Sequence, residues 1–422
     1  MNSSPSLTKK SLLLIIGILL VAANLRAPFT SLAPLLEIIR DQFTLTGAQA
    51  GLLQTLPLLA FALFSPFAAG IAKKCGIEKV IFAALLIIAT GIIYRSFGGV
   101  VGLYSGTVLI GLGIAFGNVL LPGILKRDFP HKVASLTGMY ALTMGIAAAI
   151  GSATVVPLAH IPAFGWDYSM LLTLIFPFVA AIIWLPQLRH SASTQQVSDA
   201  PHPKTGWIWR SGLAWQVTLF LGLNSLIYYI VVAWLPAILQ NLGFSATEAG
   251  SLHGILQLAT AVPGFFIGPL LSRMRDQRAI AVLVSLLAVV GLVGLLVIPT
   301  LAALWIVLFG LGAGSTIILG LAFISLRANT PVQAAALSGM AQCVGYLLAA
   351  GGPPLAGLLH DVLGGWTYPL IGCAGLALLM AFIGYLAGRA RHLEHPDLPA
   401  HTAQYVEPVS GLFIPPAEDA KE

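Results

Sequence analysis

Twelve apolar stretches, each long enough to cross a membrane as a helix, follow one another along the chain with short polar segments between them. A hydrocarbon core about 30 Å thick requires about 20 residues of helix, so each stretch predicts one transmembrane helix. The predicted spans lie near 11–35, 48–71, 79–97, 100–125, 135–158, 168–187, 213–236, 248–271, 279–299, 303–325, 335–358 and 367–388. The predicted fold class is therefore an all-α polytopic membrane protein with twelve transmembrane helices.

The polar segments divide the spans into two equal groups. The long internal segment 188–212 separates a half at 11–187 from a half at 213–388. Flanking tails are predicted at 1–10 and 389–422, the second flexible. Motifs recur between the halves at offsets of 199 to 201 residues: GLG at 111–113 and 310–312, LTGM at 136–139 and LSGM at 337–340, QAG at 49–51 and EAG at 248–250. Two parallel six-helix repeats are a plan of secondary transporters, which bind solute near the midplane between the repeats.

Composition and charge sharpen this prediction. Hydrophobic residues make up 58% of the chain and charged residues only 9%, whereas soluble domains carry about 25% charged residues. The net charge of +6 does not indicate a nucleic-acid partner, because 18 of the 21 lysines and arginines fall on one side of the predicted topology. The positive-inside rule makes that side cytoplasmic, which predicts a bacterial inner-membrane protein with both tails and the central loop in the cytoplasm. Arg40 and Arg95 are assigned to the opposite side.

Arg26 stands out because it lies within the first apolar span. A helix that begins near Ser11 carries Arg26 about 22 Å into the membrane, where a charge costs about 2.5–3.5 kcal/mol and usually faces a bundle interior or a water-filled cavity. The alternative is that the side chain snorkels to the far surface, helped by a helix break at Pro28. The acidic residues all fall at span ends or in loops. A cavity cation without a carboxylate partner favours an anion, or a group with concentrated negative charge, as its ligand.

Several polar residues within other spans are further candidates for contact with a solute. Asn224 with Tyr228, His253 with Gln257, and Gln342 with Tyr346 are each four residues apart, and Gln54 and Asn118 are single polar residues. A spacing of four places both members of a pair on one helix face. The alternative for each is a hydrogen bond between helices without any role in binding, worth about 0.6–2 kcal/mol.

His253 is the one histidine clearly inside a predicted span, and its ordinary pKa near 6.5 would suit proton coupling. A neutral histidine that donates one hydrogen bond is the alternative, since no span contains the carboxylate that usually carries the proton. The sequence also predicts no cofactor, no metal site and no enzymatic activity. GLGAG at 310–314 lies within an apolar span with no strand before it, so it fits helix packing better than dinucleotide binding.

Longer stretches resemble one particular family. These are KRDFPH at 126–131, AWQVTLFLGLNSL at 214–226, WLPAIL at 234–239, AGSLHGILQLATAVPG at 249–264 and AAALSGMAQCVGYLLAAGGPPLAG at 334–357. Over about residues 11–390 the chain is similar to the major facilitator superfamily and, within it, to the bacterial cyanate and nitroimidazole porters. It departs from superfamily signatures at Lys73, where an acid is expected, and at Thr107, where an arginine is expected. The fifth span lacks the antiporter Gly-Pro motif, whereas GGPP occurs at 351–354. These departures weaken the usual route for proton coupling.

The resemblance implies a monomeric secondary transporter in a lipid bilayer that moves a small planar solute by alternating access. In this expectation Arg26 attracts the polar or anionic end of the solute, Asn118, Asn224 and Tyr228 orient it, and Gln342 with Tyr346 closes one side. A carrier for a different substrate class, such as a drug or an organic anion, is the main alternative. A non-transporting solute sensor with the same fold is another.

Overall fold

The computed structural model describes residues 9–129, 132–162, 164–190, 206–274 and 276–393, and every regular element in these ranges is a helix. Twelve helical segments in these ranges are long and apolar enough to span a membrane, which confirms the predicted fold class. The predicted N-terminal tail, central loop and C-terminal tail lie largely outside the described residues.

The N-terminal half contains six spans, of which the first and the sixth are interrupted. Its elements are α1 (Lys9–Asn24), α2 (Ala27–Thr30), η1 (Ala33–Leu35), α3 (Leu36–Phe43), α4 (Gly47–Cys75), α5 (Ile77–Phe97), α6 (Gly99–Asp128), α7 (Val133–Ala159), α8 (Gly165–Leu171), η2 (Leu172–Leu174), α9 (Ile175–Trp184) and η3 (Leu185–His190). The segments from α1 to α3 form the first span, and those from α8 to η3 form the sixth.

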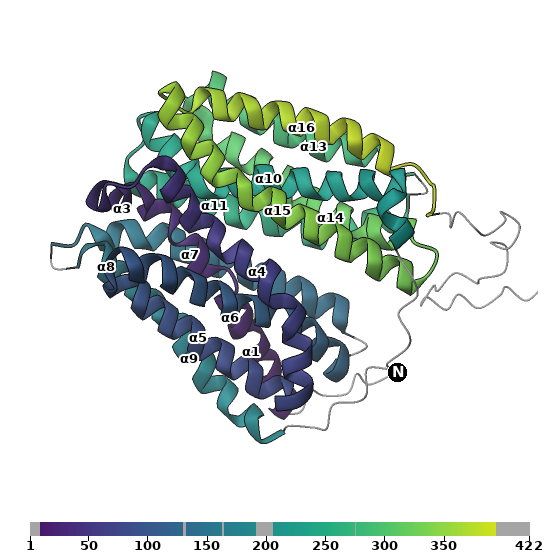
Figure 1. Cartoon of the computed structure of the whole chain (residues 1–422), viewed down its shortest axis with the longest axis horizontal. Helices are drawn as coiled ribbons and strands as arrows, with labels where there is room; N and C mark the ends of the chain where they lie inside the picture. The colour runs from purple at the N-terminus through teal and green to yellow at the C-terminus, as the bar shows by residue number, and fades with distance from the viewer. Residues whose placement is uncertain (1–8, 130–131, 163, 191–205, 275, 394–422) are drawn as a thin grey trace, which may run out of the picture.

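The C-terminal half repeats this order. Its elements are η4 (Gly206–Arg210), α10 (Gly212–Asn241), α11 (Ala246–Ala261), η5 (Val262–Phe265), α12 (Ile267–Ser272), α13 (Arg278–Val297), η6 (Pro299–Leu301), α14 (Ala302–Arg327), α15 (Pro331–Leu363) and α16 (Thr367–Ala387). The eighth span consists of α11, η5 and α12, because Pro263 interrupts the helix. Figure 1 shows the halves as two adjacent bundles, one purple to blue and the other green to yellow.

The recurring motifs do the same structural work in both halves. Thr46 and Gln49 form a capping box at the start of α4, and Ser245 and Glu248 form one at the start of α11, so QAG and EAG mark equivalent helix starts. The GLG motifs are equivalent packing sites. A Cβ on the first glycine would clash with α4 or α11, and one on the second would clash with α5 or α13. The repeat is therefore built into the helix packing.

Two helix pairs join the halves, α4 with α15 and α7 with α11. A Cβ placed on Gly47 would lie 2.4 Å from the carbonyl oxygen of Gly357, and one on Gly254 would lie 2.9 Å from that of Ala149. Such distances are possible only between glycine and a bare backbone. We call the end of the bundle where Gly47 meets Gly357 the closed end.

The halves diverge toward the other end, which we call the open end. Gly70 on α4, Gly138 on α7 and Gly339 on α15 have no atom within 4 Å of an added Cβ. The two bundles spread apart in this direction in Figure 1, beyond the contact of α4 with α15. Any solute site at the midplane is therefore reached from the open end.

Candidate functional site

Arg26 lies at a break in the first span. The span stops being helical after Asn24 and resumes at Ala27, and Arg26 itself has φ −133° and ψ −44°. Pro28 explains the break, because it has no N–H to donate to the carbonyl of Asn24. The break was expected from Pro28, and it places a half-buried guanidinium inside the bundle rather than at a membrane surface.

The guanidinium of Arg26 faces aromatic side chains and no acid. Its Cζ lies 5.5 Å from the centre of the Tyr228 ring, a cation–π contact between the first spans of the two halves. The side chains of Tyr229 and Tyr140 also lie near it. Within the described ranges, no carboxylate forms an ion pair with Arg26. Arg26 therefore lies among aromatic rings without a carboxylate partner in these ranges.

Aromatic rings from both halves surround this cation. Tyr229 packs edge-on against Tyr228 and Phe29, with ring centres 5.4 and 6.1 Å apart. Tyr346 on α15 packs against Phe61 on α4 at 6.2 Å. Tyr346 also lies near Tyr140 and Tyr229, so one cluster spans both halves. In each edge-on pair the edge of one ring packs against the face of the other, and a flat aromatic ligand could join such a cluster in the same way.

Tyr140, Tyr229, Phe29 and Phe61 are absent from the sequence-based candidates. Tyrosine within a span is the signal that could have found two of them, because the chain has only ten tyrosines and four of these gather near Arg26. No pattern in the sequence distinguishes Phe29 or Phe61 from the other phenylalanines. Their role depends on which helices meet.

Asn118 and Asn224 have different relations to this cluster. Asn118 on α6 is half-buried and accepts a hydrogen bond from the hydroxyl of Tyr140 at 3.3 Å. Tyr140 therefore lies between Asn118 and Arg26. Asn224 is buried and lies one helical turn before Tyr228, nearer the open end. The structure thus brings Asn118 into contact with the cluster and places Asn224 beside it.

Gln342 and Gln54 differ in exposure. Gln342 is exposed one turn from Tyr346 on the side of the open end, and its amide donates to the hydroxyl of Ser338 on the same helix. Gln54 on α4 is only 1% exposed, and neither atom of its amide has a hydrogen-bond partner within the described residues. Such a group is costly and is usually kept for a reason. Neither glutamine touches Arg26 in an observed contact.

His253 is fully buried between helices rather than open to a cavity. Its Nε2 lies 3.0 Å from the carbonyl oxygen of Val232, and its Nδ1 lies 3.0 Å from the hydroxyl of Ser152. Because a carbonyl can only accept, Nε2 carries the proton and Nδ1 accepts from Ser152. Gln257, four residues later, accepts a hydrogen bond from the hydroxyl of Tyr228, and its amide nitrogen packs 3.4 Å from Nε2 of His253 as a contact between two donors. The neutral, hydrogen-bonded alternative fits this geometry.

Arg95 is a second arginine inside the bundle, near the end of α5 on the side to which it was assigned with Arg40. It was assigned to a polar surface with Arg40, but only 1% of it is exposed. Its Nη1 donates to the carbonyl oxygen of Pro28 at 2.8 Å, and Nε and Nη2 have no partner within the described residues. Gly106 permits this burial, because a Cβ there would lie 2.5 Å from the Arg95 backbone nitrogen. Arg95 thus holds the helix break that carries Arg26.

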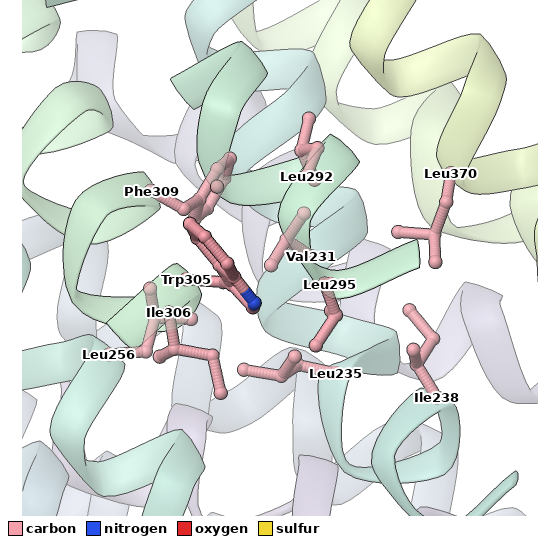
Figure 2. A pocket seen from close by; sticks show the side chains of 11 residues that line it. Val231, Leu235, Ile238, Leu256, Leu292, Leu295, Trp305, Ile306, Phe309 and Leu370 are labelled. Carbon is pink, nitrogen blue, oxygen red and sulfur yellow. The ribbon is translucent and has the colours of Figure 1, made fainter. Parts of the chain in front are cut away.

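A small apolar pocket lies elsewhere, within the C-terminal half. Figure 2 shows its lining, which includes Val231 from α10, Leu256 from α11 and Trp305 from α14. All of its lining side chains are apolar apart from the indole nitrogen, and none of the polar candidates is among them. A polar solute has no partner there, so the Arg26 cluster remains the candidate site.

The comparisons with known proteins concern the whole chain. The model of the Major Facilitator Superfamily matches residues 14–350. The 2-nitroimidazole transporter of Escherichia coli is 57% identical over 394 residues, which cover 93% of this chain and 100% of that protein. A cyanate transport protein of Escherichia coli is 26% identical over 373 residues, which cover 87% and 96%.

A solved structure has the same fold. It is a bacterial homologue of the human lysosomal transporter Spinster in an inward-facing, occupied conformation, with a TM-score of 0.70 at 15% identity. The match covers 92% of this chain and 97% of that one. The family resemblance seen in the sequence is thereby confirmed.

Proposed function

The chain belongs to the Major Facilitator Superfamily and is a secondary transporter, and we propose that it carries a small planar solute with a polar or anionic group. The observation that supports this most strongly is Arg26, a cation without a carboxylate partner among aromatic rings from both halves. A flat ring fits between aromatic faces, and a nitro or anionic group suits the guanidinium. 2-Nitroimidazole, named for one relative, has both features, and cyanate, named for another, is a linear anion that has only the second.

The distribution of basic residues supports an orientation in the bacterial inner membrane. Helix α4 runs from the closed end to the open end, so the ends of α4, α6, α14 and α16 lie together at the open end. The basic residues there include Lys73, Lys74, Lys79, Arg127, Lys132, Arg273, Arg278, Arg327, Arg389 and Arg391. Arg40 lies at the closed end. By the positive-inside rule the open end and both termini face the cytoplasm, which makes this an inward-facing state.

One chain provides both halves of the site, so we expect the monomer in the lipid bilayer to be sufficient for transport, without chemical conversion of the solute. Both ring nitrogens of His253 are engaged in its neutral form. This favours an anchoring role over proton transfer, and we expect transport that is not accelerated by a pH gradient. A carrier for drugs or other organic anions would use the same residues. A sensor would bind solute without moving it.

Flux measurements in proteoliposomes test the proposal. Labelled 2-nitroimidazole and labelled cyanate are followed with and without an imposed pH gradient, for the wild type, Arg26→Ala and Arg391→Ala. Arg391 is an exposed arginine outside the spans and is the matched control. We expect Arg26→Ala to lower flux about 10- to 100-fold, the equivalent of one hydrogen bond to a charged group, and Arg391→Ala to leave it unchanged.

Several outcomes would contradict parts of this proposal. Flux of Arg26→Ala equal to that of the wild type would remove Arg26 from the site. Binding without flux in the wild type would favour the sensor. Acceleration by the pH gradient that disappears in His253→Gln would return His253 to a role in proton transfer.

A further inference from the structure

A chain of polar contacts connects Arg26 to the packing between the two halves. It begins at Tyr228, whose ring lies under the guanidinium at 5.5 Å and whose hydroxyl donates to Oε1 of Gln257 at 3.3 Å. The amide nitrogen of Gln257 packs 3.4 Å from Nε2 of His253, and because both nitrogens carry hydrogens this link is a packing contact and not a hydrogen bond. Three residues thus lead from the cation on the first span to the middle of α11.

The next contact crosses from the C-terminal to the N-terminal half. Ser152 on α7 donates to Nδ1 of His253, and the distance between these atoms is 3.0 Å. Around this bond α7 and α11 touch closely, since a Cβ on Gly250 would lie 2.9 Å from the carbonyl oxygen of Ser152 itself. A small displacement between the halves at this point must therefore change the hydrogen bond.

The series of polar contacts then leads back to Arg26. The hydroxyl of Ser152 also lies 3.5 Å from the carbonyl oxygen of Thr30, and the hydroxyl of Thr30 donates to the carbonyl oxygen of Arg26 at 3.1 Å. Thr30 belongs to the short helix α2 that follows the break. Ser152 has one hydroxyl proton and two acceptors within reach, so it can bond to His253 in one half or to the first span in its own half.

Because the residues in this series of contacts are buried, they cannot move independently of one another. Gln257, His253, Ser152 and Thr30 are each fully buried. A buried polar network is stable when all its members are paired and costly when one partner leaves, because water cannot replace the lost bond. Tyr228 is bonded to Gln257, which packs directly against His253, so movement of Tyr228 is transmitted through this packing to the bond between His253 and Ser152 on the opposite half.

We propose that Tyr228, Gln257, His253 and Ser152 are positioning residues that couple occupancy of the Arg26 site to the contact between α7 and α11. The proposal rests on the proposed function. A solute bound at Arg26 draws the guanidinium away from the Tyr228 ring, which alters the hydroxyl contact with Gln257 and weakens the bond between His253 and Ser152. The solute thereby has a different affinity for the states with this contact intact and broken, as any shift between states requires.

The distance between spin labels across the closed end provides the test. Val101 at the start of α6 and Val297 at the end of α13 are 76% and 69% exposed and belong to opposite halves. Cysteines at these positions carry the labels, and the three native cysteines are replaced by serine or alanine. Distances are measured for the full chain in liposomes, with and without 2-nitroimidazole, in Ser152→Ala, Gln257→Ala and the unchanged background. Thr316→Val is the control, because Thr316 is buried and bonds only within α14.

We expect Ser152→Ala without solute to raise the ratio of long to short distances about three- to tenfold, the range for one buried interhelical hydrogen bond. Gln257→Ala should still bind 2-nitroimidazole, while the solute no longer changes the distance ratio. Ser152→Thr should restore the background ratio, and Thr316→Val should not differ from it.

Two results would overturn the proposal. One is a distance ratio and a solute response in Ser152→Ala and Gln257→Ala equal to those of the background. The other is loss of 2-nitroimidazole binding in Gln257→Ala, because Gln257 would then contact the solute itself. If the background protein binds no 2-nitroimidazole, the proposed function fails, and the solute-free comparison of Ser152→Ala with Thr316→Val still decides whether this bond holds the halves.

Discussion

The two contacts between the halves are built in different ways. Between α4 and α15 the backbones touch, and a Cβ on Gly51 would lie 2.5 Å from the carbonyl oxygen of Pro353. Between α7 and α11 the packing is also close, but it encloses the hydrogen bond of His253 with Ser152. The first contact depends on shape, whereas the second also carries a polar link to Arg26.

The one buried hydrogen bond between α4 and α15 that the described residues contain has a local cause. The hydroxyl of Thr55 donates to the carbonyl oxygen of Ala350 at 2.8 Å. In a regular helix this carbonyl would accept from the residue four positions later, which is Pro354 and has no N–H. The proline pair in GGPP thus frees an acceptor on α15 that α4 then uses.

The comparison assigns different work to the two contacts. A backbone contact closed by glycines stabilises one arrangement of the halves and does not depend on the solute. The contact between α7 and α11 contains side chains that lead to Arg26, so this contact changes when the solute binds or leaves. Changes to the glycine contact between α4 and α15 at the closed end, away from Phe61 and Tyr346, should therefore alter which end is closed without altering the affinity for solute in the inward-facing state.

The largest effect is expected from Gly51→Val. The added carbons would overlap the backbone of Pro353 and Pro354, and overpacking of this kind costs about 1–3 kcal/mol. The closed end should open in most molecules, and flux should fall strongly, as measured by the Val101–Val297 label distance and by proteoliposome transport. Gly375→Val on α16 is the control, because no atom lies within 4 Å of its added Cβ. Equal distances in the two variants would show that backbone contact does not hold the closed end.

A smaller effect is expected from Thr55→Val. This change keeps the shape but leaves the carbonyl of Ala350 without its donor, at a cost of about 1 kcal/mol, or roughly a fivefold shift toward the open form of this end. Thr90→Val is the matched control, since the hydroxyl of Thr90 donates to Leu86 on its own helix. The same label distances measure both. An identical shift in Thr90→Val would mean that threonine loss in general, and not this bond, is responsible.

The smallest effect is expected from Asp361→Asn at the tip of the closed end. Asp361 accepts from the guanidinium of Arg40 and from the backbone N–H of Gly47, both at 2.6 Å. The side chains of Arg40 and Asp361 are 19% and 28% exposed, so loss of the charge should cost about 0.2–1 kcal/mol. Asparagine keeps an acceptor for Gly47.

The dependence of the distance ratio on salt concentration distinguishes the contribution of the ion pair from that of the glycine contact. The distance ratio of the wild type should approach that of Asp361→Asn as the salt concentration rises, because ions screen exposed pairs. Gly51→Val should show no such dependence. A wild-type ratio that is insensitive to salt would indicate that the ion pair contributes nothing to closure.

The amino-acid sequence determined the parts of this protein that depend on local pattern. Span length and hydrophobicity predict twelve helices, and the recurring QAG and EAG motifs predict two halves because they form the capping boxes of equivalent helices. The charge of Arg26 within an apolar span was enough to indicate an interior cation, whereas a break at Pro28 was expected only with the alternative of a side chain that snorkels to the far surface. These features need only neighbours in sequence, so they can be read without the fold.

Only the tertiary structure decided which side chains meet. Arg95 lies two residues before the end of α5, where a helix end usually reaches a surface, yet a carbonyl from α2 and a glycine on α6 bury it. Tyr140 and Ser152 look like ordinary residues of an apolar helix until α10 and α11 are placed beside α7. In a membrane, lipid-facing and helix-facing positions are both apolar, so periodicity cannot tell them apart. Contacts between helices that are distant in sequence therefore determine which residues form the site.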